Sequence, residues 1–260
     1  MSSRVKHLVL LGIVFGVSMV TFAFSPLMIT KFNKSKGTIL ASKIEMLLYA
    51  YENGEITGNF FYEEDEIKIP LSGSFKERQV EVSGYDYTKK AIIKFKGEVD
   101  EQDFTGLAFV NDELLGPFNL HLWAAFPGHP KNMYYDAGCW EDSEETVEIF
   151  AAELKQQILN KDKYQVAEKV AYPLDIYLED KVLKIKNEEE FVQAFEVIFY
   201  PKFVDAIKKS HPLNMCSSYR GIMFGEVGEI WLNYVFESYP FGAELKVTGI
   251  NPNAWKLRRD

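Results

Sequence analysis

The chain has 260 residues, 47% of them hydrophobic, which is enough for one large domain or two ordinary domains with a buried core. This composition excludes disordered, collagen-like and coiled-coil proteins. Acidic residues outnumber basic ones by 38 to 29, and the net charge of −9 argues against a nucleic-acid partner, which requires a positive surface.

The N-terminus has the pattern of a targeting segment. Arg4 and Lys6 precede residues 8–30, which carry no charge. This predicts either a secretory signal over residues 1–23, cleaved after Ala23, or an uncleaved anchor over residues 8–30, because about 20 apolar residues span a bilayer. We therefore expect a periplasmic or secreted protein, or one anchored in the inner membrane. Contact with the membrane is expected only through residues 8–30, if they are retained.

Cys139 and Cys216 are the only cysteines. In an oxidising compartment one pair predicts a disulfide, and the alternative is two buried thiols. The spacings CxxC, HxxxH and HExxH do not occur, so neither a metal site nor a cofactor is expected.

Residues 38–122 read as a β-rich domain. Short apolar runs alternate with polar turns, which favours a meander that closes into a barrel or a sandwich. The seven runs are 44–51, 56–62, 67–71, 79–82, 91–95, 104–110 and 118–122. Short motifs that combine apolar residues with Gly occur at 56–62, 69–75, 95–97 and 104–106. They are similar to motifs in a β-rich module of exported bacterial proteins with no known activity.

One loop in this domain is a candidate partner contact. The residues Ser83, Gly84, Tyr85, Asp86 and Tyr87 resemble the Ser-Gly-x-x-Tyr loop that periplasmic c-type lysozyme inhibitors insert into the enzyme cleft. That resemblance implies a protein partner, and an acidic protein would complement a cationic lysozyme. The inhibitors' cysteines are missing here, and an ordinary turn explains the same residues.

Residues 123–142 include Pro127, Gly128 and Pro130 and have no apolar period, which predicts a linker. After it the pattern changes to helices followed by strands. Asp142 or Ser143 is expected to cap the first helix, and the predicted order over residues 143–252 is α-α-β-β-α-β-β-β, with Pro201 interrupting or restarting the third helix. The fold class predicted for the whole chain is therefore α+β.

The second half resembles the cone-shaped domains of the nuclear-transport-factor type, shared with ketosteroid isomerases and SnoaL-like cyclases. The short sequence motifs on which the resemblance rests are at 160–162, 170–174, 185–191, 221–225, 228–231 and 247–251. The resemblance implies a curved sheet around a long helix and a conical pocket for a small apolar ligand. It makes Asp175, Tyr177, Phe195, Met223 and Trp231 candidate pocket residues, although each aromatic or Met side chain suits a plain core equally well.

Three hypotheses about function follow. The leading one is a non-enzymatic envelope protein that binds a partner, in one version an inhibitor or immunity protein against a periplasmic cell-wall hydrolase. The second is a small-molecule-binding or isomerase- or dehydratase-like enzyme, which requires Asp175 and Tyr177 to point into a pocket. The third is a membrane-anchored structural component. No residue is assigned a catalytic role, because the nucleophile and phosphate-binding motifs are missing.

Overall fold

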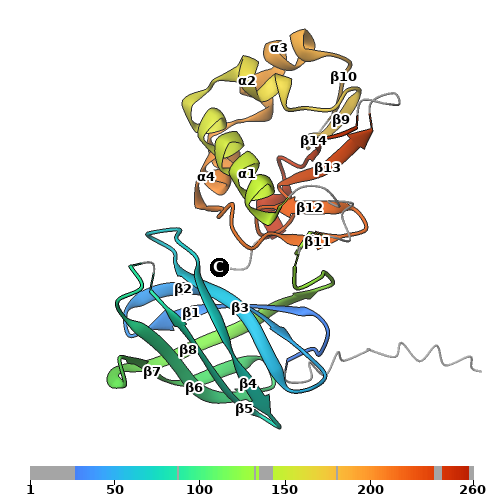
Figure 1. Cartoon of the computed structure of the whole chain (residues 1–260). Helices are drawn as coiled ribbons and strands as arrows, with labels where there is room; N and C mark the ends of the chain where they lie inside the picture. Colours follow the sequence, from blue (N-terminus) through green and yellow to red (C-terminus); the bar gives the residue numbers. More distant parts are fainter. Residues whose placement is uncertain are drawn as a thin grey trace, which may run out of the picture.

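The computed structural model describes residues 27–86, 88–131, 133–134, 143–179, 181–236 and 242–257. These residues form a closed β-barrel and an α+β unit (Figure 1). The predicted signal at 1–23 lies outside the described residues, as does most of the alternative anchor at 8–30. No helix in the described ranges is long and apolar enough to cross a membrane.

The barrel is an antiparallel meander in which β1 pairs with β8 and closes the sheet. Its strands are β1 (Phe32–Ile39), β2 (Ser42–Ala50), β3 (Glu55–Tyr62), β4 (Ile69–Lys76), β5 (Gln79–Tyr85), β6 (Ile92–Asp100), β7 (Asp103–Val110) and β8 (Glu113–Phe126). The seven predicted runs correspond to β2–β8. The β-rich domain is therefore confirmed, and of the two predicted architectures the structure has the barrel.

Side chains fill the barrel. Ring centroids of Phe60 and Phe95 lie 5.0 Å apart, those of Phe95 and Phe118 5.4 Å, and those of Phe118 and Phe104 4.8 Å, all edge to face. All four side chains are buried. Edge-to-face pairs at these separations add to the stabilisation that burial of the rings provides.

The sequence pattern does not predict the first strand, β1, because neither face of this strand is apolar. In register with β2, Asn33, Ser35 and Gly37 share the inward face with Met46 and Leu48. Lys34 and Lys36 project outward, where an exposed strand would place its polar residues. The barrel domain therefore begins six residues before the predicted boundary at 38, at Phe32.

The α+β unit has the predicted order with one additional strand and a divided third helix. Its elements are α1 (Glu144–Asn160), α2 (Lys163–Glu168), β9 (Leu174–Tyr177), β10 (Val182–Ile185), α3 (Glu188–Ile198), α4 (Pro201–Lys209), β11 (Cys216–Ser218), β12 (Gly221–Phe224), β13 (Ile230–Phe236), β14 (Ala243–Ile250) and the 3-10 helix Ala254–Leu257. β9 and β10 form a hairpin, and β11–β14 form a four-stranded antiparallel sheet.

Helix ends follow the expected capping chemistry. The Ser143 side chain accepts a hydrogen bond from the Thr146 N–H, and Asn187 caps α3 in the same way through the Glu190 N–H. Pro201 occupies the first turn of α4, where its missing N–H costs nothing. The other predicted cap, Asp142, lies outside the described residues.

The predicted linker is in part a strand. β8 continues to Phe126, so residues 123–126 belong to the barrel, and Met133 and Tyr134 are buried. Residues 135–142 lie outside the described residues. The core of the α+β unit also includes side chains from the outer wall of the barrel, Phe32, Leu47 and Tyr49 among them. The outer wall of the barrel therefore belongs to the core of the α+β unit, whereas the barrel interior forms a second core.

Candidate functional site

The loop that resembles the inhibitor motif lies at one end of the barrel. Ser83, Gly84 and Tyr85 are the last residues of β5, and Asp86 begins the turn to β6. The Asp86 carboxylate accepts hydrogen bonds from the N–H of Lys90 at 2.9 Å and of Ala91 at 3.2 Å, which organises the loop. Tyr87 lies outside the described residues.

The regular pairing of β4 and β5 ends beside this loop, although Gly84 still lies close to the backbone of Pro70. Their pairing ends at Ser72 and Ser83, and the next positions would bring Pro70, which has no N–H, opposite Tyr85. A hollow of about 640 Å³ lies here, bordered by Ser83–Asp86 together with Pro70, Leu71, Ser72, Lys89 and Ile92. Tyr85 and Ile92 are cross-strand neighbours on its border, and both are exposed.

Exposed apolar side chains gather at this end of the barrel. In a meander, the turns β1–β2, β3–β4, β5–β6 and β7–β8 share one end, and large apolar side chains on or beside these turns are solvent-exposed. They are Leu40, Ile67, Tyr85, Ile92, Leu114 and Leu115, here called the apolar rim. Tyr85 is 60% exposed and Leu114 62%. Among the described barrel residues, only Ile29 and Leu107 are large, apolar and exposed elsewhere.

The loop itself is not acidic. Residues 83–90 carry Asp86 against Lys89 and Lys90, so the acidic excess of the chain is located elsewhere. The expected charge complementarity with a cationic enzyme therefore does not come from this loop.

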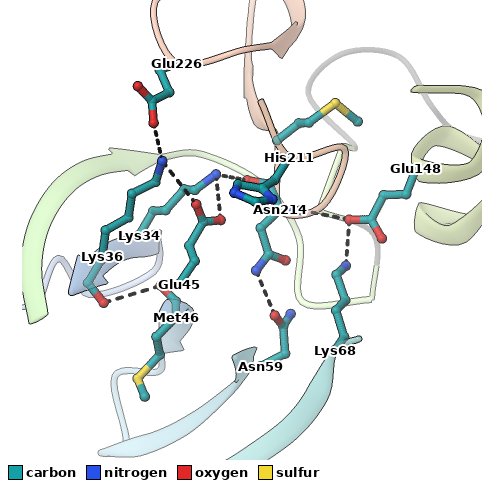
Figure 2. A network of polar contacts seen from close by, with 12 residues as sticks. Lys34, Lys36, Glu45, Met46, Asn59, Lys68, Glu148, His211, Asn214 and Glu226 are labelled. Carbon is teal, nitrogen blue, oxygen red and sulfur yellow. Dashed lines mark hydrogen bonds and ion pairs between the residues drawn. The ribbon is translucent and has the colours of Figure 1, made fainter. Parts of the chain in front are cut away.

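A buried polar network joins the barrel to the α+β unit (Figure 2). Lys34 on β1 donates a hydrogen bond to the backbone oxygen of Asn214 at 2.6 Å, and its Nζ lies 2.9 Å from Glu45 Oε1 on β2. Lys36 approaches Glu45 from the other side at 3.6 Å and pairs with Glu226 in the β12–β13 turn. Lys34 and Glu45 are both buried. Breaking such a pair is costly, because removing one partner leaves the other charge buried without a counter-ion.

A second cluster in the network is centred on Glu148 of α1. Its Oε1 accepts from the Tyr134 hydroxyl at 3.1 Å and from the Asn214 N–H at 2.9 Å, and Lys68 Nζ lies 2.6 Å away. Burial raises the pKa of Glu148, with Lys68 acting in the opposite direction. Burial also raises the pKa of Tyr134. Asn214 additionally donates to Asn59 Oδ1 on β3 at 2.7 Å.

A third contact lies at the edge of this interface. Glu66 in the β3–β4 turn accepts from His211 at 2.7 Å and from Lys155 of α1 at 3.3 Å. These bonds, with those of Lys34 and Glu148, hold the two units in one arrangement. They account for the buried side chains of Lys34, Glu45 and Glu148 as structural groups of the interface.

The predicted pocket residues do not come together. Asp175 and Tyr177 lie on the exposed face of β9, opposite the buried Leu174 and Ile176. The expectation that they point into a pocket is therefore wrong: the strand alternates, and its Leu174 face is the one that packs on the core. Phe195 is a core residue that packs against Phe199.

The remaining two pocket candidates are neighbours on the sheet. Met223 and Trp231 face each other across β12 and β13, both half-buried. Trp231 lies next to a register shift between β13 and β14. The five candidates are thus distributed between an exposed strand face, the helical core and the sheet.

Cys216 begins β11, half-buried beside the Lys34–Glu45 pair, and it is a free thiol in the structure. Burial raises the pKa of this thiol. Its expected partner, Cys139, lies outside the described residues, so the disulfide stays a prediction. In the part of the chain that the structure describes, no three His, Cys, Asp or Glu side chains are grouped to hold a metal ion.

Comparison with known proteins gives no assignment. No family model matches the chain, and no curated protein or solved structure is significantly similar to it. The resemblances of short sequence motifs to known families therefore stay predictions.

Proposed function

We propose that this protein is a non-enzymatic binding protein of the cell envelope, and that it contacts a protein partner through the apolar rim. The observation that carries the proposal is the concentration of exposed apolar side chains at one end of the barrel. Exposed apolar patches on soluble domains commonly mark interaction sites. Tyr85 is the central candidate, because aromatic side chains dominate the energetics of protein interfaces.

The filled interior of the barrel supports this proposal. Aromatic side chains occupy the space that a ligand would need in a ligand-binding barrel, so recognition is expected on the outside. The network around Lys34 and Glu148 supports it as well, because a rigid scaffold presents a binding surface at a lower entropic cost.

The specific form of the proposal is inhibition of a periplasmic cell-wall hydrolase. The test measures binding of the purified protein to c-type lysozymes and other cell-wall hydrolases by biolayer interferometry, followed by hydrolase activity on cell-wall substrate. Micromolar or tighter binding that is lost in Tyr85→Ser and Leu114→Ser supports it. Tyr219→Ser is the matched control, since Tyr219 is also exposed but lies on the α+β unit. Absence of binding to every hydrolase tested rejects this form.

Two further parts of the proposal concern export and the fold of the second unit. Export is supported by the uncharged stretch at 8–30, and mass spectrometry of the native protein tests it: a chain that starts at Phe24 supports cleavage, and an intact N-terminus supports the anchor. The cone-type assignment of residues 143–252 is supported by the order of elements and by the four-stranded sheet. An experimental structure compared with cone-type domains tests it.

A further inference from the structure

A second surface, on the α+β unit and independent of the apolar rim, has the composition of a ligand site. α1, α2 and β14 border a hollow of about 790 Å³. Small-molecule sites have volumes of roughly 300–1,000 Å³, so this one is large enough for a ligand of several rings. Lys161, in the left-handed conformation, ends α1 and turns the chain into α2, which places the two helices on adjoining sides of the hollow.

Amide side chains are concentrated along its lining. Gln156, Gln157 and Asn160 reach it from the last turns of α1, and Gln165 from α2. Each amide offers an acceptor oxygen and two N–H donors in one plane. Such a group can accept from one hydroxyl and donate to its neighbour, so a row of amides suits a ligand that carries hydroxyls on adjacent carbons.

One of these amides has an unused acceptor. Gln157 Oε1 is buried and has no hydrogen-bond partner within the described residues. A buried polar atom without a partner costs about 1–3 kcal/mol, so its retention calls for an explanation. This oxygen is closed to solvent in the structure, so a ligand hydroxyl would reach it only after the Gln157 side chain turns toward the hollow that it lines.

The charges around the hollow disfavour an anionic ligand. Lys169 pairs with Glu153 at 3.0 Å and Lys246 with Glu244 at 3.0 Å, so both lysines of the lining already have carboxylate partners. The acidic groups are not arranged to bind a metal ion among the described residues. The lining has four carboxylates, Glu153, Asp162, Glu168 and Glu244, against these two lysines, and carboxylate oxygens, like amide oxygens, can accept hydrogen bonds from the hydroxyl groups of a neutral ligand.

Apolar contact beside the amides is limited, because Lys169 Nζ lies 4.4 Å from the centroid of the Phe150 ring and covers one of its faces. The half-buried ring of Phe150 and the buried side chain of Leu245 also border the hollow. Sugar rings combine hydroxyl edges with apolar C–H faces, so they match a lining of amides next to a ring and an aliphatic side chain. We propose that the hollow between α1, α2 and β14 binds a neutral oligosaccharide.

The test is titration of the full protein with a panel of neutral trisaccharides that differ in sugar and linkage: tri-N-acetylglucosamine, maltotriose and cellotriose. Binding is measured by ligand-observed NMR and calorimetry. We expect saturable binding of at least one probe at millimolar concentration or tighter, and a weakening of tenfold or more in Gln157→Leu and in Gln165→Ala.

The variants separate loss of the site from loss of the fold. Gln165 is exposed, so its truncation leaves the core intact, and Gln157→Leu removes an oxygen that has no partner to lose. Gln165→Ala should therefore unfold at the wild-type urea concentration, and Gln157→Leu at the same or a higher concentration. Gln193→Ala, an exposed amide on α3 outside this hollow, is the control and should bind normally. If no trisaccharide binds, or if Gln157→Leu and Gln165→Ala bind as wild type does, the proposal is wrong. Neither outcome bears on the apolar rim, which belongs to the barrel.

Discussion

His211 Nδ1 lies 2.7 Å from Glu66 Oε1, a contact that joins the loop after α4 to the turn between β3 and β4. It is one of several bonds that unite the barrel with the α+β unit. Lys155 Nζ lies 3.3 Å from the same carboxylate oxygen.

The pKa of Glu66 is lowered, chiefly by its hydrogen bond with His211 and also by Lys155. A folded-state pKa below the unfolded value stabilises the protein above the ordinary carboxyl pKa of about 4.3, and this stabilisation is lost as the pH falls through the folded value. Glu66→Gln should therefore lower the urea midpoint at about pH 6, and this deficit should shrink as the pH falls below about 4.3. Glu77→Gln, an exposed acid on the barrel, is the control. A deficit that persists unchanged at the acidic end contradicts the prediction.

The contribution of Glu148 to stability depends on pH in the opposite direction. Burial raises its pKa, so the folded protein holds this proton more tightly than the unfolded chain does. Its contribution to stability therefore decreases as the pH rises through the interval between the unfolded and folded pKa values. Relative to wild type, Glu148→Gln should become more stable as the pH increases from acidic to neutral, as measured by urea unfolding at a series of pH values. A relative stability that falls over this range would show that the ion pair with Lys68 outweighs burial.

Lys34→Met should be among the most destabilising substitutions of a lysine in this chain. It leaves Glu45 buried with only the more distant Lys36 as a counter-ion, and breaking a buried pair costs about 3–5 kcal/mol. The double variant Lys34→Met with Glu45→Leu should recover much of the loss, because no unpaired charge remains. Urea unfolding of the single and double variants measures this, with Lys36→Met as the less buried control. Additive losses in the double variant would contradict it.

Gly37 lies where the barrel closes. A Cβ at this position would come within 1.9 Å of the Asn119 backbone oxygen on β8, so even alanine forces the two strands apart. Gly37→Ala should destabilise the protein by at least about 1–3 kcal/mol, the usual cost of overpacking. Hydrogen exchange should show the loss of protection centred on β1 and β8. The neighbouring Thr38→Ala serves as the control, and equal stability of the two variants would be inconsistent with this close approach.

Cys216 should react slowly in the folded protein. Burial raises the pKa of its thiol, which decreases the thiolate fraction at neutral pH. In Cys139→Ser protein we expect Ellman's reagent to modify Cys216 readily only after unfolding in urea, and fast modification of the folded form would contradict this. In the unmodified chain, unfolding without reductant tests the predicted disulfide: two reactive thiols exclude it, and none supports it.

Much of the secondary structure could be predicted from the sequence, because most elements bury one face. The stripe Val147, Ala151, Leu154 and Ile158 identifies α1, since all four side chains are buried. β1 was missed for the opposite reason. Its inward face holds Asn33, Ser35 and Gly37, and its outward lysines are buried by a unit that lies far along the chain. β11 is only three residues long and gives no period.

The candidate sites were harder to predict from the sequence than the secondary structure. The loop at Ser83–Asp86 was found because its residues are contiguous, whereas the apolar rim unites residues from four separate turns. The contact between Lys34 and Asn214 spans 180 residues, and no local pattern signals it. Asp175 and Tyr177 were assigned to a pocket by analogy, because the sequence does not reveal which face of a four-residue strand packs on the core.

Leu47, Tyr49 and Phe61 lie on the outer wall of the barrel, and all three are buried. The barrel's own hydrogen-bonded pairing is complete once Phe126 has been synthesised, but this apolar stripe stays uncovered until the helices and sheet that follow have folded onto it. A chain cut between the two units would expose that stripe to water together with the Lys34–Glu45 pair. The boundary that topology draws between the barrel and the α+β unit therefore cuts through a packed interface, and neither unit alone would keep these side chains covered.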